Sequence, residues 1–182
     1  MQRRKLDRIV TGIGAMLTIV FIAAGALLSW GANFATNTVH DQLAAQQIYF
    51  PPAGSDALKP AEIGPYLNKY ADQQLTTGKQ AEAYADHFIA VHIKEIAGGK
   101  TYAQVSGEAM KDPSNAQLQG QVAALFKGET LRGLLLNAYA FSIFGDIARY
   151  ASWAAYAAAA VMLLLVLLGW RHASKVDPGT TL

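Results

Sequence analysis

Residues 9–30, IVTGIGAMLTIVFIAAGALLSW, and residues 150–170, YASWAAYAAAAVMLLLVLLGW, decide the fold of this chain. Each stretch is apolar, carries no charged residue and is about 21 residues long. That length matches the roughly 20 helical residues that cross a hydrocarbon core about 30 Å thick. Because a backbone in lipid must satisfy its own hydrogen bonds, we expect both stretches to be transmembrane helices.

Basic residues next to both stretches predict their orientation. Four lie among residues 3–8, and Arg171 and Lys175 follow the second stretch. Short flanks rich in lysine and arginine stay in the cytoplasm. We therefore expect a multi-pass protein of the cytoplasmic membrane with both termini in the cytoplasm. Trp30 and Trp170 lie at the ends of the stretches, where interfacial aromatic residues are expected.

Two alternatives to a two-span topology remain open. Ala24-Gly25-Ala26 resembles a signal-peptide cleavage site, and cleavage there would start the mature chain at Leu27. The first stretch is longer than the usual signal core of about 7–15 residues, which favours an uncleaved anchor. Leu131–Ala148 could form a third span, but the chain would have no room to turn before Tyr150.

The composition limits the chemistry that the chain can perform. The 182 residues include no cysteine, which excludes disulfides, thiolate zinc sites and cysteine nucleophiles. Residues 32–148 carry eleven acidic and eight basic residues, a net charge of −3. This segment has no basic patch interleaved with aromatic residues, so we expect no nucleic acid partner.

The segment between the two apolar stretches has helical signals. The first span is expected to continue over residues 33–49, until Pro51-Pro52 ends it. Helical spacing of apolar residues predicts further helices over residues 60–75, 78–97 and 101–110. In the first of these, Gly64-Pro65 could instead divide the segment into a short turn and a helix from Pro65. Asp112-Pro113 predicts a helix start, and Lys127-Gly128 predicts its end. A last helix is expected from Glu129 into the second span. No period-two alternation predicts a strand.

We therefore predict an all-α fold: a two-transmembrane helical hairpin with an extracytoplasmic helical-bundle domain built on extensions of both spans. The predicted segments follow one another along the chain: a cytoplasmic tail at 1–8, transmembrane helix 1 at 9–30, the extracytoplasmic domain at 31–148, transmembrane helix 2 at 149–170 and a cytoplasmic tail at 171–182.

Small residues on the two spans are candidates for helix–helix packing. Gly25 and Ser29 are four residues apart in the first span, and Ala151, Ala155 and Ala159 share a face of the second. Small residues let helices approach closely in lipid, where packing drives association. These faces either pack the two spans of this chain together or dock against a larger membrane partner.

Asp146 and Arg149 are three residues apart near the expected outer membrane boundary. A charge close to lipid is costly unless it is paired or reaches the interface. We interpret the two residues as an interfacial charge pair that marks the membrane surface. A relay or a partner contact is the functional alternative.

No catalytic constellation is recognisable. His87 and His92 lie about 140° apart around one helix, which does not suit a shared metal, although Glu95 and His40 could join His92. Glu82 and Asp86 have a spacing that is common on solvated helix faces, and no nucleophile accompanies them. The chain contains no GxSxG, HExxH or glycine-rich phosphate motif. We therefore expect neither an enzyme nor a bound cofactor or metal.

Several phrases of the sequence resemble a known group of proteins. They are RKLDRIVTGIGAMLTIV, HDQLAAQQIYFPP, QAEAYADHFIAVHI, TYAQVS and LFKGETLRGLLLNAYAFSIFG. Together they are similar to small two-span membrane proteins of actinobacteria, many of which carry the label aromatic ring-opening dioxygenase. Extradiol ring cleavage requires iron held by two histidines and a carboxylate. His40, His87 and His92 stand in no motif of that kind, so the resemblance implies the architecture and no site residues.

The sequence thus favours a non-enzymatic membrane accessory or scaffold protein. Its expected partners are the lipid bilayer and another membrane or envelope protein, with self-association as a further possibility. The alternative is an extracytoplasmic sensing domain that binds an apolar ligand among its aromatic residues and is coupled to a membrane partner. A sizeable apolar cavity would favour this second hypothesis.

Overall fold

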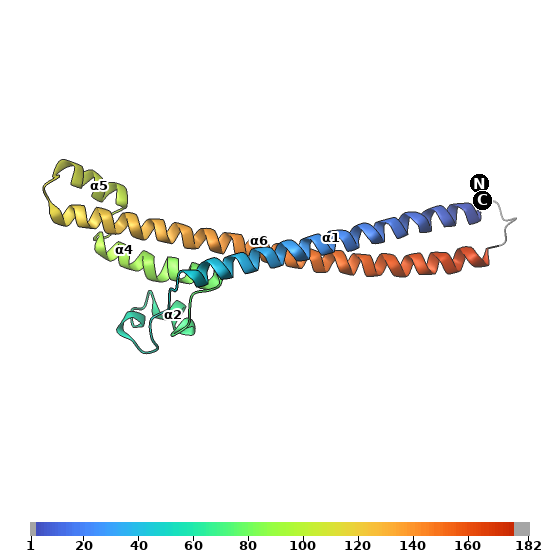
Figure 1. Ribbon diagram of the computed structural model, residues 1–182, viewed down its shortest axis with the longest axis horizontal. Helices are drawn as coiled ribbons and strands as arrows, with labels where there is room; N and C mark the ends of the chain where they lie inside the picture. The colour runs from blue at the N-terminus through green and yellow to red at the C-terminus, as the bar shows by residue number, and fades with distance from the viewer. Residues whose placement is uncertain (1–2, 177–182) are drawn as a thin grey trace. The chain divides into compact units, whose positions relative to one another are not determined.

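The computed structural model describes residues 3–176, which form two compact units. Residues 3–34 and 144–176 form the first, which we call the apolar unit, and residues 35–143 form the second, the core unit. Residues 1–2 and 177–182 of the two predicted tails lie outside the described residues. The elements in chain order are α1 (Arg3–Ala45), η1 (Asp56–Leu58), α2 (Gly64–Leu67), η2 (Asn68–Tyr70), α3 (Gly78–Tyr84), η3 (Ala85–Ile89), α4 (Ala90–Ile96), α5 (Tyr102–Lys111) and α6 (Ala116–Lys175) (Figure 1).

The predicted all-α class is confirmed for the described part of the chain. Residues 3–176 contain no strand, and the β-type contact there is an isolated bridge between Tyr49 and Gln74. The backbone amide of Phe50 donates to Gln73, and that of Leu75 donates to Ile48. These bonds hold the two ends of the 48–75 segment together.

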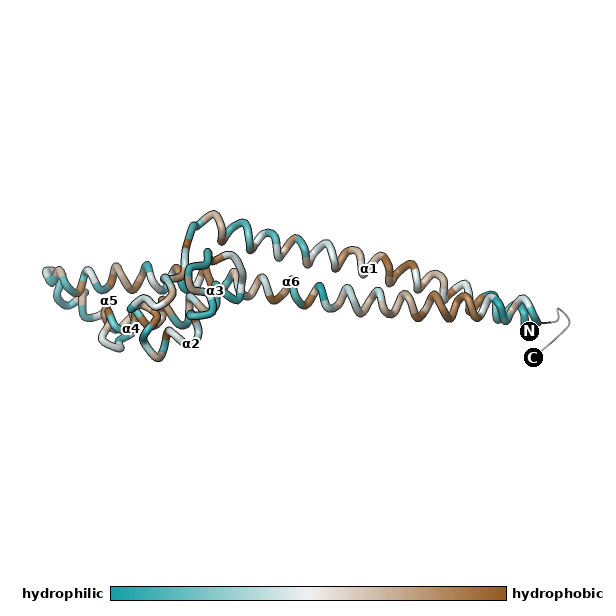
Figure 2. The backbone as a smooth tube through the Cα atoms, turned by 90° about the horizontal axis from the view of Figure 1, so that it is seen from below, coloured by the Kyte–Doolittle hydropathy of each residue, from teal (hydrophilic) through white to brown (hydrophobic). Residues whose placement is uncertain are grey.

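Two long helices make up the apolar unit, and both are long and apolar enough to cross a membrane. Figure 2 shows that the hydrophobic residues of α1 and α6 concentrate in their parts within this unit. Large apolar side chains on both helices are exposed, among them Ile19, Leu27, Leu164 and Leu168. A continuous exposed apolar surface is unusual for a soluble protein and is the surface that lipid requires.

α1 and α6 run antiparallel within the apolar unit. Gly14 near the start of α1 lies against Val166 near the end of α6, whereas Gly25 lies against Tyr156. The residue numbers rise on one helix as they fall on the other, which defines the direction. The two apolar stretches are therefore paired within this unit.

The core unit contains the apolar core. Its buried side chains come from the end of α1, the 48–75 segment, α3 to α5 and the first half of α6: Val39, Leu43, Phe50, Leu58, Ile63, Leu67, Leu75, Ala81, Ala85, Ile89, Ile93, Ala97, Val105, Leu125 and Leu135. Leu67, Leu75, Ala81 and Ala85 are completely buried. This is one modest core, as a segment of this length allows.

The predicted helix over residues 78–97 is present, with one local change. Thr77 caps it through a capping box with Gln80, which satisfies amides that a helix start leaves free. Gly98 and Gly99 adopt positive φ angles of 57° and 81° and close it in a Schellman motif, with the Gly99 amide donating to Lys94. In the middle, α3 passes into α4 through η3, which is one turn of π-helix.

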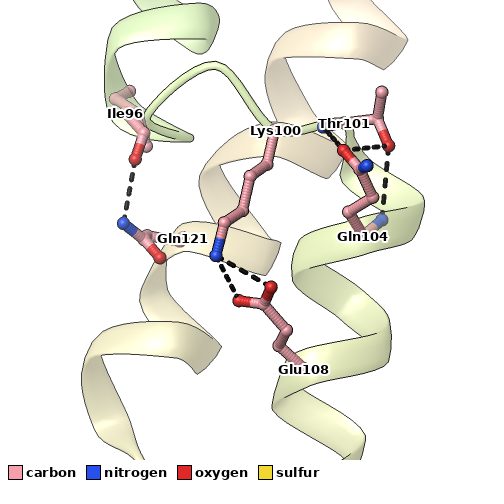
Figure 3. Close-up of polar contacts among 6 residues, drawn as sticks. All are labelled: Ile96, Lys100, Thr101, Gln104, Glu108 and Gln121. Atoms are coloured by element: carbon pink, nitrogen blue, oxygen red, sulfur yellow. Dashed lines mark hydrogen bonds and ion pairs between the residues drawn. The ribbon is translucent and has the colours of Figure 1, made fainter.

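Polar contacts fix the connection between α4 and α5 (Figure 3). Thr101 caps α5 in a capping box with Gln104. Lys100 Nζ lies 2.7 Å and 2.8 Å from the two carboxylate oxygens of Glu108. The side-chain amide of Gln121 on α6 donates to the carbonyl of Ile96 at 2.9 Å, which ties α4 to α6.

Three predicted helix boundaries are wrong. In place of one helix over residues 60–75, the short α2 starts at Gly64, close to the alternative start at Pro65, and is followed by η2; Asp72 with φ of 62° ends this segment. α6 begins at Ala116 and not at Pro113, because Asn115 Oδ1 accepts from the Leu118 amide and so caps it. α1 ends at Ala45, and Gln47 with φ of 54° turns the chain.

Gly128 was expected to end a helix, and this prediction is also wrong. α6 continues through it without interruption to Lys175. A Cβ at Gly128 would overlap Cγ2 of Ile93, so the glycine permits close packing between α6 and α4. Residues 131–148 and 150–170 therefore belong to one helix, and the chain does not turn back between them, as a separate third span would require.

Candidate functional site

Of the predicted small residues, Gly25 of α1 lies against Tyr156 of α6. A Cβ at Gly25 would come within 2.8 Å of the Tyr156 ring, so only glycine fits there without a shift. Ala159 is buried, and Ser29, Ala151 and Ala155 are half-buried. These contacts support the interpretation that the small faces pack the two helices of this chain together.

Burial along α1 and α6 follows a seven-residue repeat. The predicted pairs of small residues four positions apart, such as Gly25 and Ser29, include only part of it. Buried residues recur at intervals of seven: Thr18, Gly25 and Ala32 on α1, and Gly145, Ser152 and Ala159 on α6. Such a repeat keeps one seam of two helices in contact. The buried hydroxyls are satisfied within their own helices, because Thr18 donates to the Gly14 carbonyl and Ser152 donates to the Arg149 carbonyl.

Asp146 and Arg149 lie one turn apart on α6 within the apolar unit. Asp146 is exposed and Arg149 is half-buried. Two aromatic residues follow directly, with Tyr150 and Trp153 in an edge-to-face contact at 5.4 Å between ring centroids. Charged residues beside an aromatic pair are typical of a membrane interface.

Each of the three histidines of the core unit has its own neighbour. His40 Nδ1 lies 3.2 Å from Asp41, and His92 Nδ1 lies 2.7 Å from the carbonyl oxygen of Phe88. His87 stacks flat on Tyr66, with ring centroids 3.4 Å apart and planes 3° apart. Over residues 3–176, no three histidine, aspartate or glutamate side chains are arranged to hold a metal ion.

The Tyr66–His87 stack forms a wall of a cavity beside the π-helical turn, which we call the π-turn cleft. Its volume is about 250 Å³. A second cavity of about 380 Å³ shares Tyr66, Asp86 and His87 and lies next to it. The residues that line the π-turn cleft are Tyr66, Lys69, Tyr70, Lys79, Glu82, Ala83, Asp86, His87 and Tyr139. All belong to the core unit.

Asp86 is the ion-paired carboxylate of the π-turn cleft, whereas Glu82 and the two lysines form no ion pair in the described part of the chain. Asp86 Oδ1 accepts from Arg132 at 2.9 Å, and these side chains are 36% and 34% exposed. The Glu82 carboxylate, first through its charge, together with burial and a side-chain hydrogen-bond contribution from Glu82, raises the pKa of Tyr139. Among the described residues, no carboxylate forms an ion pair with Lys69 or Lys79.

The sequence did not single out this cleft. Glu82 and Asp86 looked like residues of a solvated helix face, because their partners Tyr139 and Arg132 come from α6, about fifty residues further on. Nothing in the periodicity of residues 78–97 indicates a π-helical turn. Burial also raises the pKa of Tyr84, whose ring lies near Phe50 and Phe88.

A separate cavity of the core unit lies between α1 and α6, away from the π-turn cleft, and we call it the amide groove. Its volume is about 320 Å³. Its lining carries no charged side chain and consists of Thr38, Val39, Gln42, Leu43, Gln46, Leu134, Asn137, Ala138 and Phe141. Leu134 is 60% exposed and Phe141 39% exposed, so apolar surface is open to solvent there.

The two surfaces differ in the ligands that they can accept. The amide groove offers uncharged donors and acceptors beside apolar side chains, whereas the π-turn cleft offers unpaired lysines and aromatic walls. The chain matches no family model, no curated protein and no solved structure.

Proposed function

We propose that this protein is a non-enzymatic accessory or scaffold protein that docks with other membrane or envelope proteins. Two apolar helices anchor it in the cytoplasmic membrane. The basic flanks favour both termini in the cytoplasm, which leaves the core unit on the outer side. The core unit is then the part of the protein that meets an envelope partner.

The amide groove is the observation that carries this proposal. Leu134 and Phe141 expose apolar surface beside the side-chain amides of Gln42, Gln46 and Asn137. The occupant that fits is an amphipathic helix of a partner protein, with small apolar and uncharged polar residues. A charged segment would lose hydration in this groove without gaining a counter-charge.

The membrane helices support the same assignment. One of their small residues, Gly25, lies against Tyr156 of the same chain, which leaves less room there for a partner helix. What remains on the outside of the apolar unit are large aliphatic side chains suited to lipid. Docking specificity is therefore better provided by the core unit.

Photocrosslinking tests the proposal. A photoreactive amino acid at Asn137, within the amide groove, should crosslink one partner membrane protein in intact cells. The same amino acid at Ala140, which is exposed on α6 and does not line the groove, is the matched control. Mass spectrometry of the adduct identifies the partner. Adducts only with a second copy of the chain would replace the proposal with self-association. No adduct, together with a monodisperse monomer in mild detergent, would contradict it.

Sensing of a small ligand is a second candidate function, and the π-turn cleft favours it. The sequence suggested an apolar ligand, but the walls of this cleft combine aromatic rings with charged side chains. These walls would therefore accept a charged ligand with an apolar part better than a purely apolar one.

A further inference from the structure

The π-turn cleft lies at an irregular turn of its helix. A π-helical turn is rare, and where it occurs in an α-helix it often marks a functional site. The turn covers residues 85–89 and includes both Asp86 and His87, which line the cleft. From this turn, Asp86 meets Arg132 of α6 and His87 meets Tyr66 of α2.

The unpaired charges of the cleft are two cations and one anion. Asp86 is neutralised by Arg132, whose other terminal nitrogen lies 3.6 Å from Glu129. Lys69 and Lys79 remain without a carboxylate partner in the described chain, although Lys69 Nζ stands 4.8 Å from the centre of the Tyr70 ring. Glu82 influences the Tyr139 hydroxyl and forms no ion pair among the described residues, so its carboxylate has acceptor capacity left for a ligand.

This arrangement matches a ligand with one carboxylate and one ammonium group. Two lysines can share a carboxylate, which a charge-assisted hydrogen bond holds about twice as strongly as a neutral one. Glu82 can accept from an ammonium group. A ligand with only one of these charges would leave the opposite charge of the cleft unmatched.

The size and the walls of the cleft narrow the ligand further. The volume of about 250 Å³ lies below the roughly 300–1,000 Å³ of pockets that hold drug-sized ligands, so the ligand must be small. The rings of Tyr66, Tyr70 and Tyr139 supply apolar surface. A short aliphatic side chain would use that surface.

We propose that the π-turn cleft binds a free α-amino acid with a short aliphatic side chain. Lys69 and Lys79 bind its carboxylate, Glu82 binds its ammonium group, and the Tyr66–His87 stack forms the wall beside it. The inference stands apart from the docking proposal, because the amide groove shares no lining residue with the cleft.

Titration calorimetry on the full chain in mild detergent tests this assignment, with L-leucine as the probe. Its two single-charge analogues, 4-methylpentanoate and 3-methylbutylamine, should bind at least about tenfold more weakly, a loss of about 1.4 kcal/mol. Failure of L-leucine to bind would overturn the proposal. Equal binding of either analogue would overturn the assignment of a zwitterionic ligand.

Variants locate the binding to the cleft. Lys79→Gln and Glu82→Gln should each weaken L-leucine binding about tenfold. Lys111→Gln changes an exposed lysine of α5 outside the cleft and should bind as the unchanged protein does. Circular dichroism confirms that each variant keeps its helix content. Binding that is unaffected in both Lys79→Gln and Glu82→Gln would place the ligand elsewhere and overturn the assignment.

Discussion

Replacement of Gly128 by alanine tests the packing of α6 against α4. Gly128, Gly120 and Gly133 all lie within α6, and alanine at any of them should gain roughly 1 kcal/mol of helix propensity. A Cβ at Gly133 or Gly120 meets no atom within 4 Å. At Gly128 the new Cβ would overlap Cγ2 of the buried Ile93, and overpacking of this kind costs about 1–3 kcal/mol.

The comparison between two variants isolates the packing cost. Gly133→Ala should stabilise the core unit by about 1 kcal/mol. Gly128→Ala receives the same gain and pays the overlap, so it should be less stable than Gly133→Ala by about 1–3 kcal/mol. Thermal unfolding in mild detergent, followed by circular dichroism, should separate the two melting temperatures by at least about 2 °C.

Removal of the opposing side chain provides the control. Ile93→Ala alone should cost about 2–5 kcal/mol, because Ile93 is a buried core residue. In that background the overlap is gone, and Gly128→Ala should become stabilising, as Gly133→Ala is. If Gly128→Ala already stabilises the unchanged protein as much as Gly133→Ala does, the close approach of α6 and α4 is refuted.

Four further substitutions have expected outcomes. Gly25→Leu should lower the stability of the paired helices by about 1–3 kcal/mol in a denaturant titration in mild detergent, whereas Gly12→Leu, with no atom within 4 Å, should not. Glu82→Gln should lower the Tyr139 pKa in an ultraviolet phenolate titration; an unchanged pKa would remove the Glu82 contact. Because the Tyr139 pKa is raised in the folded protein, Tyr139 contributes fully to stability at a pH below its unfolded pKa of about 10. This contribution is lost as the pH rises through the folded pKa. Tyr139→Phe should therefore remove this dependence of stability on pH. Gly99→Ala should cost about 1–2 kcal/mol in thermal unfolding, because its φ of 81° suits glycine.

Local signals in the sequence predicted much of the fold. Thr77 and Thr101 are followed three residues later by glutamine, and both helices start with the capping box that this spacing allows. Gly98-Gly99 ends its helix because two successive positive φ angles suit glycine. The two apolar stretches could be recognised as helices from their length and composition alone. Both lie in helices that are long and apolar enough to span a membrane.

The rest depended on contacts between residues far apart in the chain. In the sequence, Lys127-Gly128 is typical of a helix end. Only the approach of Ile93 from α4 shows that Gly128 has a role in packing. Asp86 and Glu82 could not be assigned to a cleft from their own helix, because Arg132 and Tyr139 come from α6. Asp112-Pro113 carried a valid start signal, but Asn115 provides the cap instead.

Cysteine labelling in intact cells tests the proposed topology most directly, because the chain has no cysteine of its own. Lys111→Cys lies on exposed α5 of the core unit, and Lys5→Cys lies on the exposed first turn of α1. A membrane-impermeant maleimide should label Lys111→Cys in intact cells and Lys5→Cys only after permeabilisation. Labelling of Lys5→Cys in intact cells, or protection of Lys111→Cys, would contradict a two-span anchor with the core unit outside.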